Sequence, residues 1–262
     1  MGLARVALQL TRPYSSSLAF LSILVPVFAR TSNLSQSLQR AVPLLFISMC
    51  TFIINDLDDV EKDRINHPER PLPSAQVPPY LVALFYYVCL ASALLTIRFC
   101  IGAHYISFFY YLLLTLSISY SYVVEYLPAM KPVYVAGASS IPVLIVTTYY
   151  PRETSLYWVA VAIFFFNLGR ELCKDLPDRP GDPVSVLHAI DPRRVAVAAF
   201  GFQAAGLGLL SLHIKTLLGF LAILVMAMLF AVAYICWFRL DRVTQALALM
   251  KAMIFCGLYF LL

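Results

Sequence analysis

The sequence NDLDDVEKD occupies residues 55–63, directly after an apolar run, and leads into RPLPS at residues 70–74. Successive residues of an α-helix turn by about 100°, so Asn55, Asp56, Asp59 and Asp63 fall within one wedge of roughly 100°. The other acids of the stretch point elsewhere. Three carboxylates this close repel one another, and each tends to hold a proton unless a metal ion or a basic group intervenes. Oxygen ligands alone suit Mg²⁺, which bridges carboxylates to substrate phosphates.

The composition predicts a membrane protein. Hydrophobic residues make up 61% of the 262 residues and charged residues only 13%. Long apolar runs recur along the whole chain, which indicates an all-α, multi-pass integral membrane protein. The six cysteines are scattered through apolar runs without CxxC spacing, and the four histidines are dispersed. These patterns argue against a disulfide framework and against a histidine-based metal site.

Nine apolar segments are long enough to be membrane-spanning helices, and we expect them to form a single transmembrane domain over residues 1–262. Their expected ranges are 14–30, 41–57, 78–97, 104–124, 132–150, 154–173, 193–212, 216–238 and 243–262. Most connections are short. The two longer polar loops, 58–77 and 174–192, follow the second and the sixth segments, so both lie on one side of the membrane. Long loops in a tight bundle are where function is expected.

Lysine and arginine predict the orientation. With the N-terminus inside, the inside loops hold most of these residues, which favours a cytoplasmic N-terminus and cytoplasmic acidic loops. The alternative is that the acids themselves draw these cations to their loops. Without the two acidic loops the bias disappears, so the orientation depends on them.

A second acidic cluster lies in the sequence NLGRELCKDLPDRPGD, residues 167–182. Asn167, Glu171, Lys174, Asp175 and Asp178 recur at i, i+4, i+7, i+8 and i+11, which is again one helical face. The prolines that follow should end the helix. A single acidic cluster is often only a solvated loop, but two on the same side, each beside lysine or arginine, favour a function. A diphosphate suits such a pair, because Mg²⁺ and basic side chains neutralise its charge.

The residues that match a known family are the two motifs together. Asn55-Asp56-x-x-Asp59-x-x-x-Asp63, followed by Arg70-Pro71-Leu72-Pro73-Ser74, resembles the first aspartate-rich motif of the UbiA superfamily of intramembrane prenyltransferases. Glu171-x-x-Lys174-Asp175-x-x-Asp178-x-x-Gly181-Asp182 resembles the second motif. Arg12-Pro13, and Tyr120-Ser121 followed by Lys131, also fit the family. The resemblance covers essentially the whole chain and implies nine transmembrane helices around a central cavity.

The resemblance also implies roles for residues in the two motif regions, 55–77 and 167–192. The implied Mg²⁺ and diphosphate ligands are Asp56, Asp59, Asp63, Asp175, Asp178 and Asp182, with assistance from Asn55. The implied catalytic residues are Asp59, Asp63, Asp178 and Lys131. The implied substrate contacts are Arg64, Arg70 and Lys174 to phosphate, with Lys131, and Tyr120.

Three functions are open at this point. In the first, the enzyme ionises an isoprenyl diphosphate and an aromatic or lipid acceptor captures the prenyl group. In the second, the chain is a membrane-bound terpene cyclase of the same superfamily, which converts a diphosphate such as farnesyl diphosphate to a cyclic terpene. The third, a cation transporter, would place acids near the bilayer midplane in broken helices. The expected partners are the isoprenyl diphosphate, a small-molecule acceptor and the lipid bilayer, with no nucleic acid.

Overall fold

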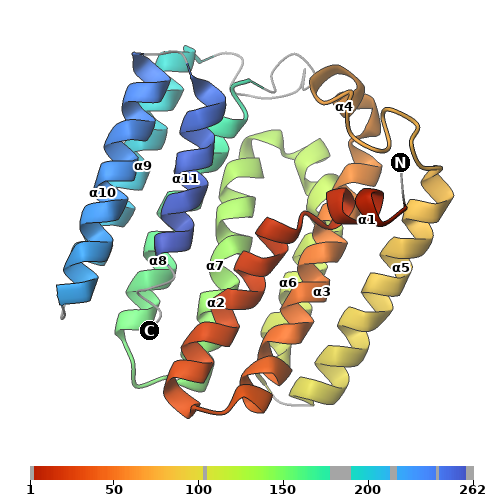
Figure 1. Ribbon diagram of the computed structural model, residues 1–262, viewed down its shortest axis with the longest axis horizontal. Coiled ribbons are helices and arrows are strands. Elements are labelled where there is room, and N and C mark those ends of the chain that lie inside the picture. Colours follow the sequence, from red (N-terminus) through yellow and green to blue (C-terminus); the bar gives the residue numbers. More distant parts are fainter. Residues whose placement is uncertain (1–2, 103–104, 178–189, 213–216, 240–241, 258–262) are drawn as a thin grey trace. The chain divides into compact units, whose positions relative to one another are not determined.

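The computed structural model describes residues 3–102, 105–177, 190–212, 217–239 and 242–257 (Figure 1). These ranges contain helices and no strand, which confirms the predicted all-α class. Eight of the helices are long and apolar enough to cross a membrane. The described residues divide into two compact units, one up to Tyr126 and one from Leu127 onward.

The first unit is built around one long helix. Its elements are α1 (Leu3–Thr11), α2 (Pro13–Thr31), α3 (Leu34–Asp58), α4 (Val60–Asn66), α5 (Pro79–Thr96), the π-helical turn η1 (Ile97–Ile101) and α6 (Ser107–Tyr126). Helix α3 packs against α1, α2, α5 and α6 (Figure 1). Two hydrogen bonds join α3 to α6: Thr51 Oγ1 donates to Ser117 Oγ at 2.8 Å, and Tyr110 OH donates to the Arg40 carbonyl at 2.6 Å. Polar pairing of this kind fixes the register of helices that are otherwise apolar.

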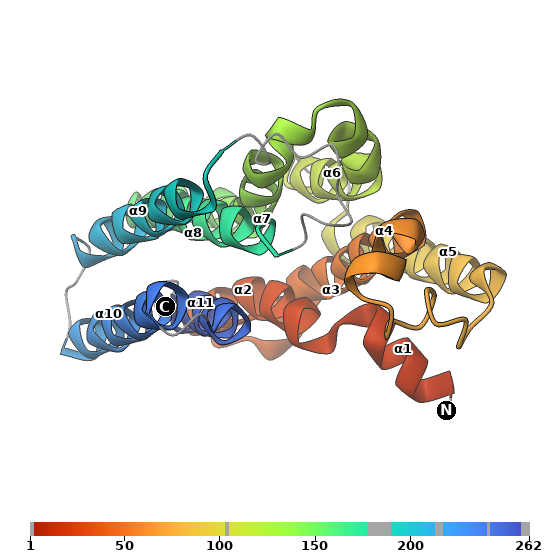
Figure 2. The same ribbon diagram turned by 90° about the horizontal axis from the view of Figure 1, so that it is seen from above.

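The second unit contains η2 (Pro128–Met130), α7 (Lys131–Tyr149), α8 (Ser155–Lys174), α9 (Pro192–Ser211), α10 (Leu217–Phe238) and α11 (Val243–Gly257). Helix α8 packs against both α7 and α9, while α10 pairs with α11 (Figure 2). Glycines let α8 and α9 approach closely. A Cβ atom at Gly169 would lie 2.3 Å from the Ala199 carbonyl oxygen, and one at Gly206 would lie 2.9 Å from the Ala162 carbonyl oxygen. Small residues at such crossings are typical of membrane helix pairs.

Within the described residues each predicted apolar segment overlaps a helix, but some boundaries differ. Helix α3 begins at Leu34 rather than at 41, because the Asn33 side chain caps it by accepting from the Gln36 N–H at 3.0 Å. Its first turns are polar, so hydropathy alone does not reveal them. The short helices α1 and α4 were not among the predicted apolar segments, because α1 is too brief to give a hydropathy signal and α4 is polar. The last segment is described only to Gly257, so nine spans and a single domain over 1–262 stay predictions.

Candidate functional site

The first acidic motif lies where α3 gives way to α4. The helix is interrupted only at Asp59, and its hydrogen bonds continue through the break: the Asp59 N–H donates to the Asn55 carbonyl at 2.9 Å, and the Asp63 N–H donates to the Asp59 carbonyl at 2.8 Å. Asp56 and Asp63 are each only 5% exposed and Asp59 is half-buried, whereas Asp58 is exposed. Burial therefore follows the helical face expected from the sequence.

Two arginines neutralise the buried carboxylates. Arg70 Nη1 lies 2.5 Å from Asp63 Oδ2 and 3.7 Å from Asp56 Oδ1. The Arg12 guanidinium pairs with Asp56 as well and lies 5.1 Å from the centre of the Phe52 ring. These contacts supply the basic groups that the repulsion between the carboxylates requires.

The backbone of Arg12 is unusual. Its φ of 44° lies in the left-handed region, which residues other than glycine rarely adopt. Arg12 stands between α1 and α2, directly before Pro13, so this conformation turns the chain between the two helices. Non-glycine residues held in such a conformation are found preferentially at functional sites.

The remaining first-motif candidates lie further out. Arg64 is exposed and pairs with the exposed Glu61 at 2.8 Å, so it lies on the outer face of α4. Lys62 Nζ lies 3.3 Å from Asp59 Oδ1. Asn55 is half-buried one residue before Asp56, and Tyr120 is half-buried on α6 of the same unit.

The second acidic motif forms the end of α8. Asp175 is 6% exposed, and its Oδ1 atom lies 2.8 Å from the Nζ atom of Lys131 at the start of α7. Glu171 is 3% exposed; Arg170 pairs with it, and Lys174 Nζ lies 3.7 Å from its Oε2 atom. Burial raises the pKa of Asp175 above its ordinary value, while the nearby Lys131 ammonium opposes that rise.

Helix α8 ends at Lys174, shortly before Pro177, as the prolines predict. Asp178 and Asp182, two of the residues implied by the resemblance, lie outside the described residues.

Sequence reasoning missed three residues of these clusters. Glu171 was seen in the motif but given no role, although it is among the most buried acids. Arg170 was also given no role. Lys251 lies on α11, within electrostatic range of Glu171. The signal for Lys251 was available, because it is a lone cation inside an apolar segment, and such residues are rarely there without a function.

The donor chemistry of the clusters fits Mg²⁺, but the described residues of either unit do not by themselves form a complete ligand set. No group of three histidine, cysteine, aspartate or glutamate side chains that could hold a metal ion occurs within the described residues. The first unit contributes the buried carboxylates of Asp56 and Asp63, and the second contributes Glu171 and Asp175. Carboxylate oxygens are the ligands that Mg²⁺ prefers, and it commonly uses one or two of them and completes its shell with water and phosphate oxygens.

The family model described as "UbiA prenyltransferase family" matches residues 19–256 of this chain. The chain belongs to the UbiA prenyltransferase family. This confirms the resemblance read from the two motifs and, at the level of the family, the expectation of a prenyl-diphosphate enzyme in a multi-pass membrane fold.

Curated relatives share one name. A digeranylgeranylglyceryl phosphate synthase of Methanopyrus kandleri is 30% identical over 185 residues, which cover 68% of this chain and 65% of the relative. A synthase of the same name from Pyrococcus horikoshii is 28% identical over 197 residues, covering 70% and 67%. The matched region thus spans about two thirds of these relatives' length.

Solved structures match the fold over nearly the whole chain. A UbiA homologue from Aeropyrum pernix K1 superimposes with a TM-score of 0.70 at 15% identity, covering 98% of this chain and 96% of the homologue. A UbiA homologue from Archaeoglobus fulgidus, bound to GPP and Mg²⁺, gives a TM-score of 0.66 at 16% identity, covering 98% and 99%.

Proposed function

We propose that this chain transfers a prenyl group from an isoprenyl diphosphate to a hydroxyl of a glyceryl phosphate lipid, with Mg²⁺ as cofactor. The observation that carries the proposal is the pair of polar clusters at helix ends of a UbiA-family chain, each with buried carboxylates tied to basic residues. The acceptor class is supported by the relatives' name, which describes a glyceryl phosphate that carries two geranylgeranyl groups. The cofactor is supported by Archaeoglobus fulgidus homologues bound to GPP or DMAPP with Mg²⁺.

In this proposal the two clusters serve one substrate. They follow the second and the sixth long helices, so they lie on the same side of the membrane when every span crosses once. The proposed ligands of Mg²⁺ and the diphosphate are Asp56, Asp59, Asp63, Asp175, Asp178 and Asp182, with Asn55. Bound Mg²⁺ supplies positive charge that stabilises the departing diphosphate.

The basic residues near the two acidic motifs are the proposed contacts to the diphosphate. Arg70 and Lys131 each lie beside a buried carboxylate, and we assign them contacts to the non-bridging oxygens of the diphosphate, together with Lys174. Arg64, which pairs with Glu61 on the exposed face of α4, is the weakest of the proposed phosphate contacts. Tyr120, on α6, is a further proposed substrate contact.

The reaction breaks the bond between C1 of the prenyl chain and the diphosphate oxygen, and the diphosphate leaves with the electron pair. The acceptor's hydroxyl oxygen then forms a bond to C1, and its proton is released to the diphosphate. The apolar interior of the bundle excludes water from the allylic cation, so the hydroxyl is the available nucleophile. Aromatic rings can stabilise such a cation through their faces.

The matched relatives favour transfer over cyclisation, because their name describes the product of two prenyl transfers. The cyclase alternative gains no support from them. An aromatic acceptor is likewise less favoured than a glyceryl phosphate.

The test uses the full-length protein in membranes or detergent with labelled geranylgeranyl diphosphate, Mg²⁺ and geranylgeranylglyceryl phosphate. We expect a labelled ether lipid that forms only with the acceptor and is lost with EDTA. Parallel reactions contain an aromatic acid acceptor or no acceptor. A cyclic hydrocarbon formed without acceptor would establish a cyclase, and transfer to the aromatic acid alone would overturn the assigned acceptor class.

A further inference from the structure

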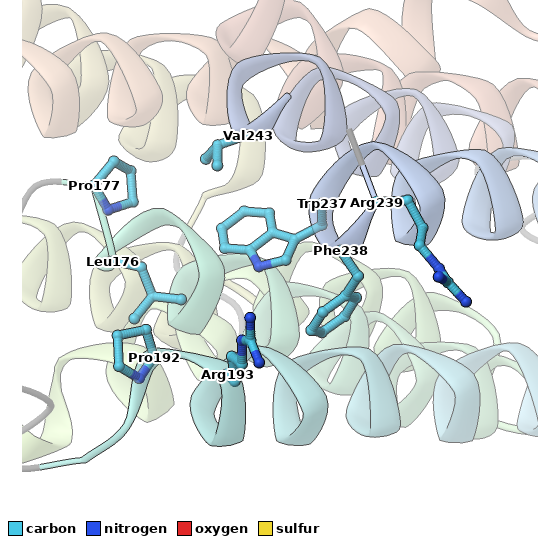
Figure 3. A pocket seen from close by; sticks show the side chains of 8 residues that line it. All are labelled: Leu176, Pro177, Pro192, Arg193, Trp237, Phe238, Arg239 and Val243. Atoms are coloured by element: carbon cyan, nitrogen blue, oxygen red, sulfur yellow. The ribbon is translucent and has the colours of Figure 1, made fainter. Parts of the chain in front are cut away.

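A pocket of about 510 Å³ lies in the second unit, at the ends of four helices (Figure 3). Leu176 lines it just after α8, and Arg193 lines it at the start of α9. Trp237 and Phe238 line it at the end of α10, followed by Arg239. Figure 3 shows the Arg193 guanidinium directed toward the two aromatic rings, while the Arg239 side chain extends away from Trp237. The pocket thus joins an aromatic wall to a cation.

The helix ends place this pocket at the depth of the lipid headgroups. Helix α10 has 22 residues, almost all apolar and none charged. At 1.5 Å per residue it is roughly 33 Å long, which matches the thickness of a bilayer's hydrocarbon core. Its last residues, Trp237 and Phe238, therefore lie near the membrane–water boundary, where tryptophan is enriched. The pocket residues beside them come from just beyond the end of α8 and the start of α9, at the same level.

The pocket rim also has positive charge that no described carboxylate neutralises. Arg193 and Arg239, the two cations that line the pocket, are both exposed, and neither forms an ion pair within the described part of the chain. Asp191, two residues before Arg193, caps α9 by accepting from the Arg193 N–H at 2.8 Å. By contrast, Arg64, Arg70 and Arg170, the arginines of the acidic motifs among the described residues, are each paired with a carboxylate.

We propose that this pocket binds the phosphate headgroup of an anionic membrane glycerolipid. Arg193 contacts the phosphate, Arg239 at the rim adds to the attraction, and Trp237 and Phe238 pack against the glycerol and the first methylenes of the lipid. Basic pockets between membrane helices on the cytoplasmic side are known to suit such headgroups, and the predicted orientation places this one there. None of these residues belongs to the proposed diphosphate site, so the inference does not depend on the proposed function.

The test is native mass spectrometry of the full-length protein in detergent, titrated with phosphatidylglycerol or with phosphatidylcholine of the same acyl chains. We expect phosphatidylglycerol to bind more tightly by roughly tenfold, the size of one charge-assisted contact. The double variant Arg193→Gln/Arg239→Gln should lose this preference. Arg152→Gln is the matched control, because Arg152 is an exposed arginine of the same unit in the turn between α7 and α8.

Several outcomes would overturn the proposal. Equal binding of the two lipids by the unaltered protein would do so, as would an unchanged preference in the double variant or an equal loss in Arg152→Gln. A further arm adds inorganic phosphate: if millimolar phosphate displaces the lipid completely, the pocket is a phosphate-ion site and not a lipid site. Size-exclusion profiles verify that each variant is folded.

Discussion

Replacing Lys131 with methionine tests how the buried charges of the second motif are held. The Lys131 Nζ to Asp175 Oδ1 distance is 2.8 Å, and the two side chains are 14% and 6% exposed. Methionine keeps the length of the lysine stem but removes its charge. Asp175 then keeps its buried position without its closest cation.

The expected cost follows from burial. Removing one partner of a buried ion pair typically costs about 3–5 kcal/mol, because the other charge stays buried and uncompensated. The exposed pair Arg64–Glu61 has the same 2.8 Å contact, with side chains 59% and 79% exposed, and such pairs contribute about 0–1 kcal/mol. Arg64→Met is therefore a matched control that differs in burial and not in contact distance.

The cost should depend on pH in a defined direction. Burial already raises the pKa of Asp175, and losing Lys131 removes a charge that lowers it, so the pKa of the variant's carboxyl rises further. A carboxyl whose pKa is higher in the folded state than in the unfolded state, where it is about 3.9, stabilises the fold while it is protonated. This contribution is complete below the unfolded-state pKa and is lost as the pH rises through the folded-state pKa. The deficit of Lys131→Met relative to the unaltered protein should thus be large at neutral pH and shrink on acidification.

The assay is reversible unfolding in mixed detergent micelles, titrated with SDS at several pH values and followed by tryptophan fluorescence. The reasoning is refuted if Lys131→Met and Arg64→Met lower the free energy of unfolding equally at pH 7. A deficit that grows as pH falls would equally contradict it.

Three further predictions concern other parts of the chain. Gly169→Ala should lower the free energy of unfolding by about 1–3 kcal/mol, because its Cβ would meet the Ala199 carbonyl, whereas Gly137→Ala, with nothing within 4 Å, should be neutral in the same SDS titration. Lys251→Met should raise the KM for the isoprenyl diphosphate in steady-state kinetics, because it removes a cation within electrostatic range of Glu171 in the second motif. An unchanged KM would show that Lys251 has only a packing role. Arg70→Gln should raise that KM by at least about tenfold, the loss of one charge-assisted contact, and a KM equal to that of the unaltered enzyme would exclude Arg70 from the diphosphate site.

Much of the fold is predictable because apolar segments that cross a membrane must form helices. The apolar runs 154–173 and 216–238 predict helices directly, since an unpaired backbone is costly in lipid. The polar first turns of α3 were not predictable in this way, because their helical form depends on the local cap from Asn33. The short helix α1 is likewise too brief to give a hydropathy signal.

The candidate site was predictable in its acids and less so in their partners. Helical periodicity correctly separated the inward Asp56 and Asp63 from the exposed Asp58. The pairing of Arg12 with Asp56 spans 44 positions in the sequence and depends on a left-handed turn before Pro13, which no periodicity reveals. The burial of Glu171 was not predictable for a similar reason, because it arises from the packing of α8 against neighbouring helices.

Diphosphate release by aspartate variants tests the central claim, a site made from both acidic motifs. The measurement is diphosphate released from geranylgeranyl diphosphate with Mg²⁺ and acceptor by Asp59→Ala, Asp178→Ala and the control Asp58→Ala, whose side chain is exposed and off the motif's face. The account predicts that the first two variants lose activity while remaining inserted in the membrane, and that the control retains it. Turnover retained in Asp59→Ala or in Asp178→Ala would contradict the two-motif site.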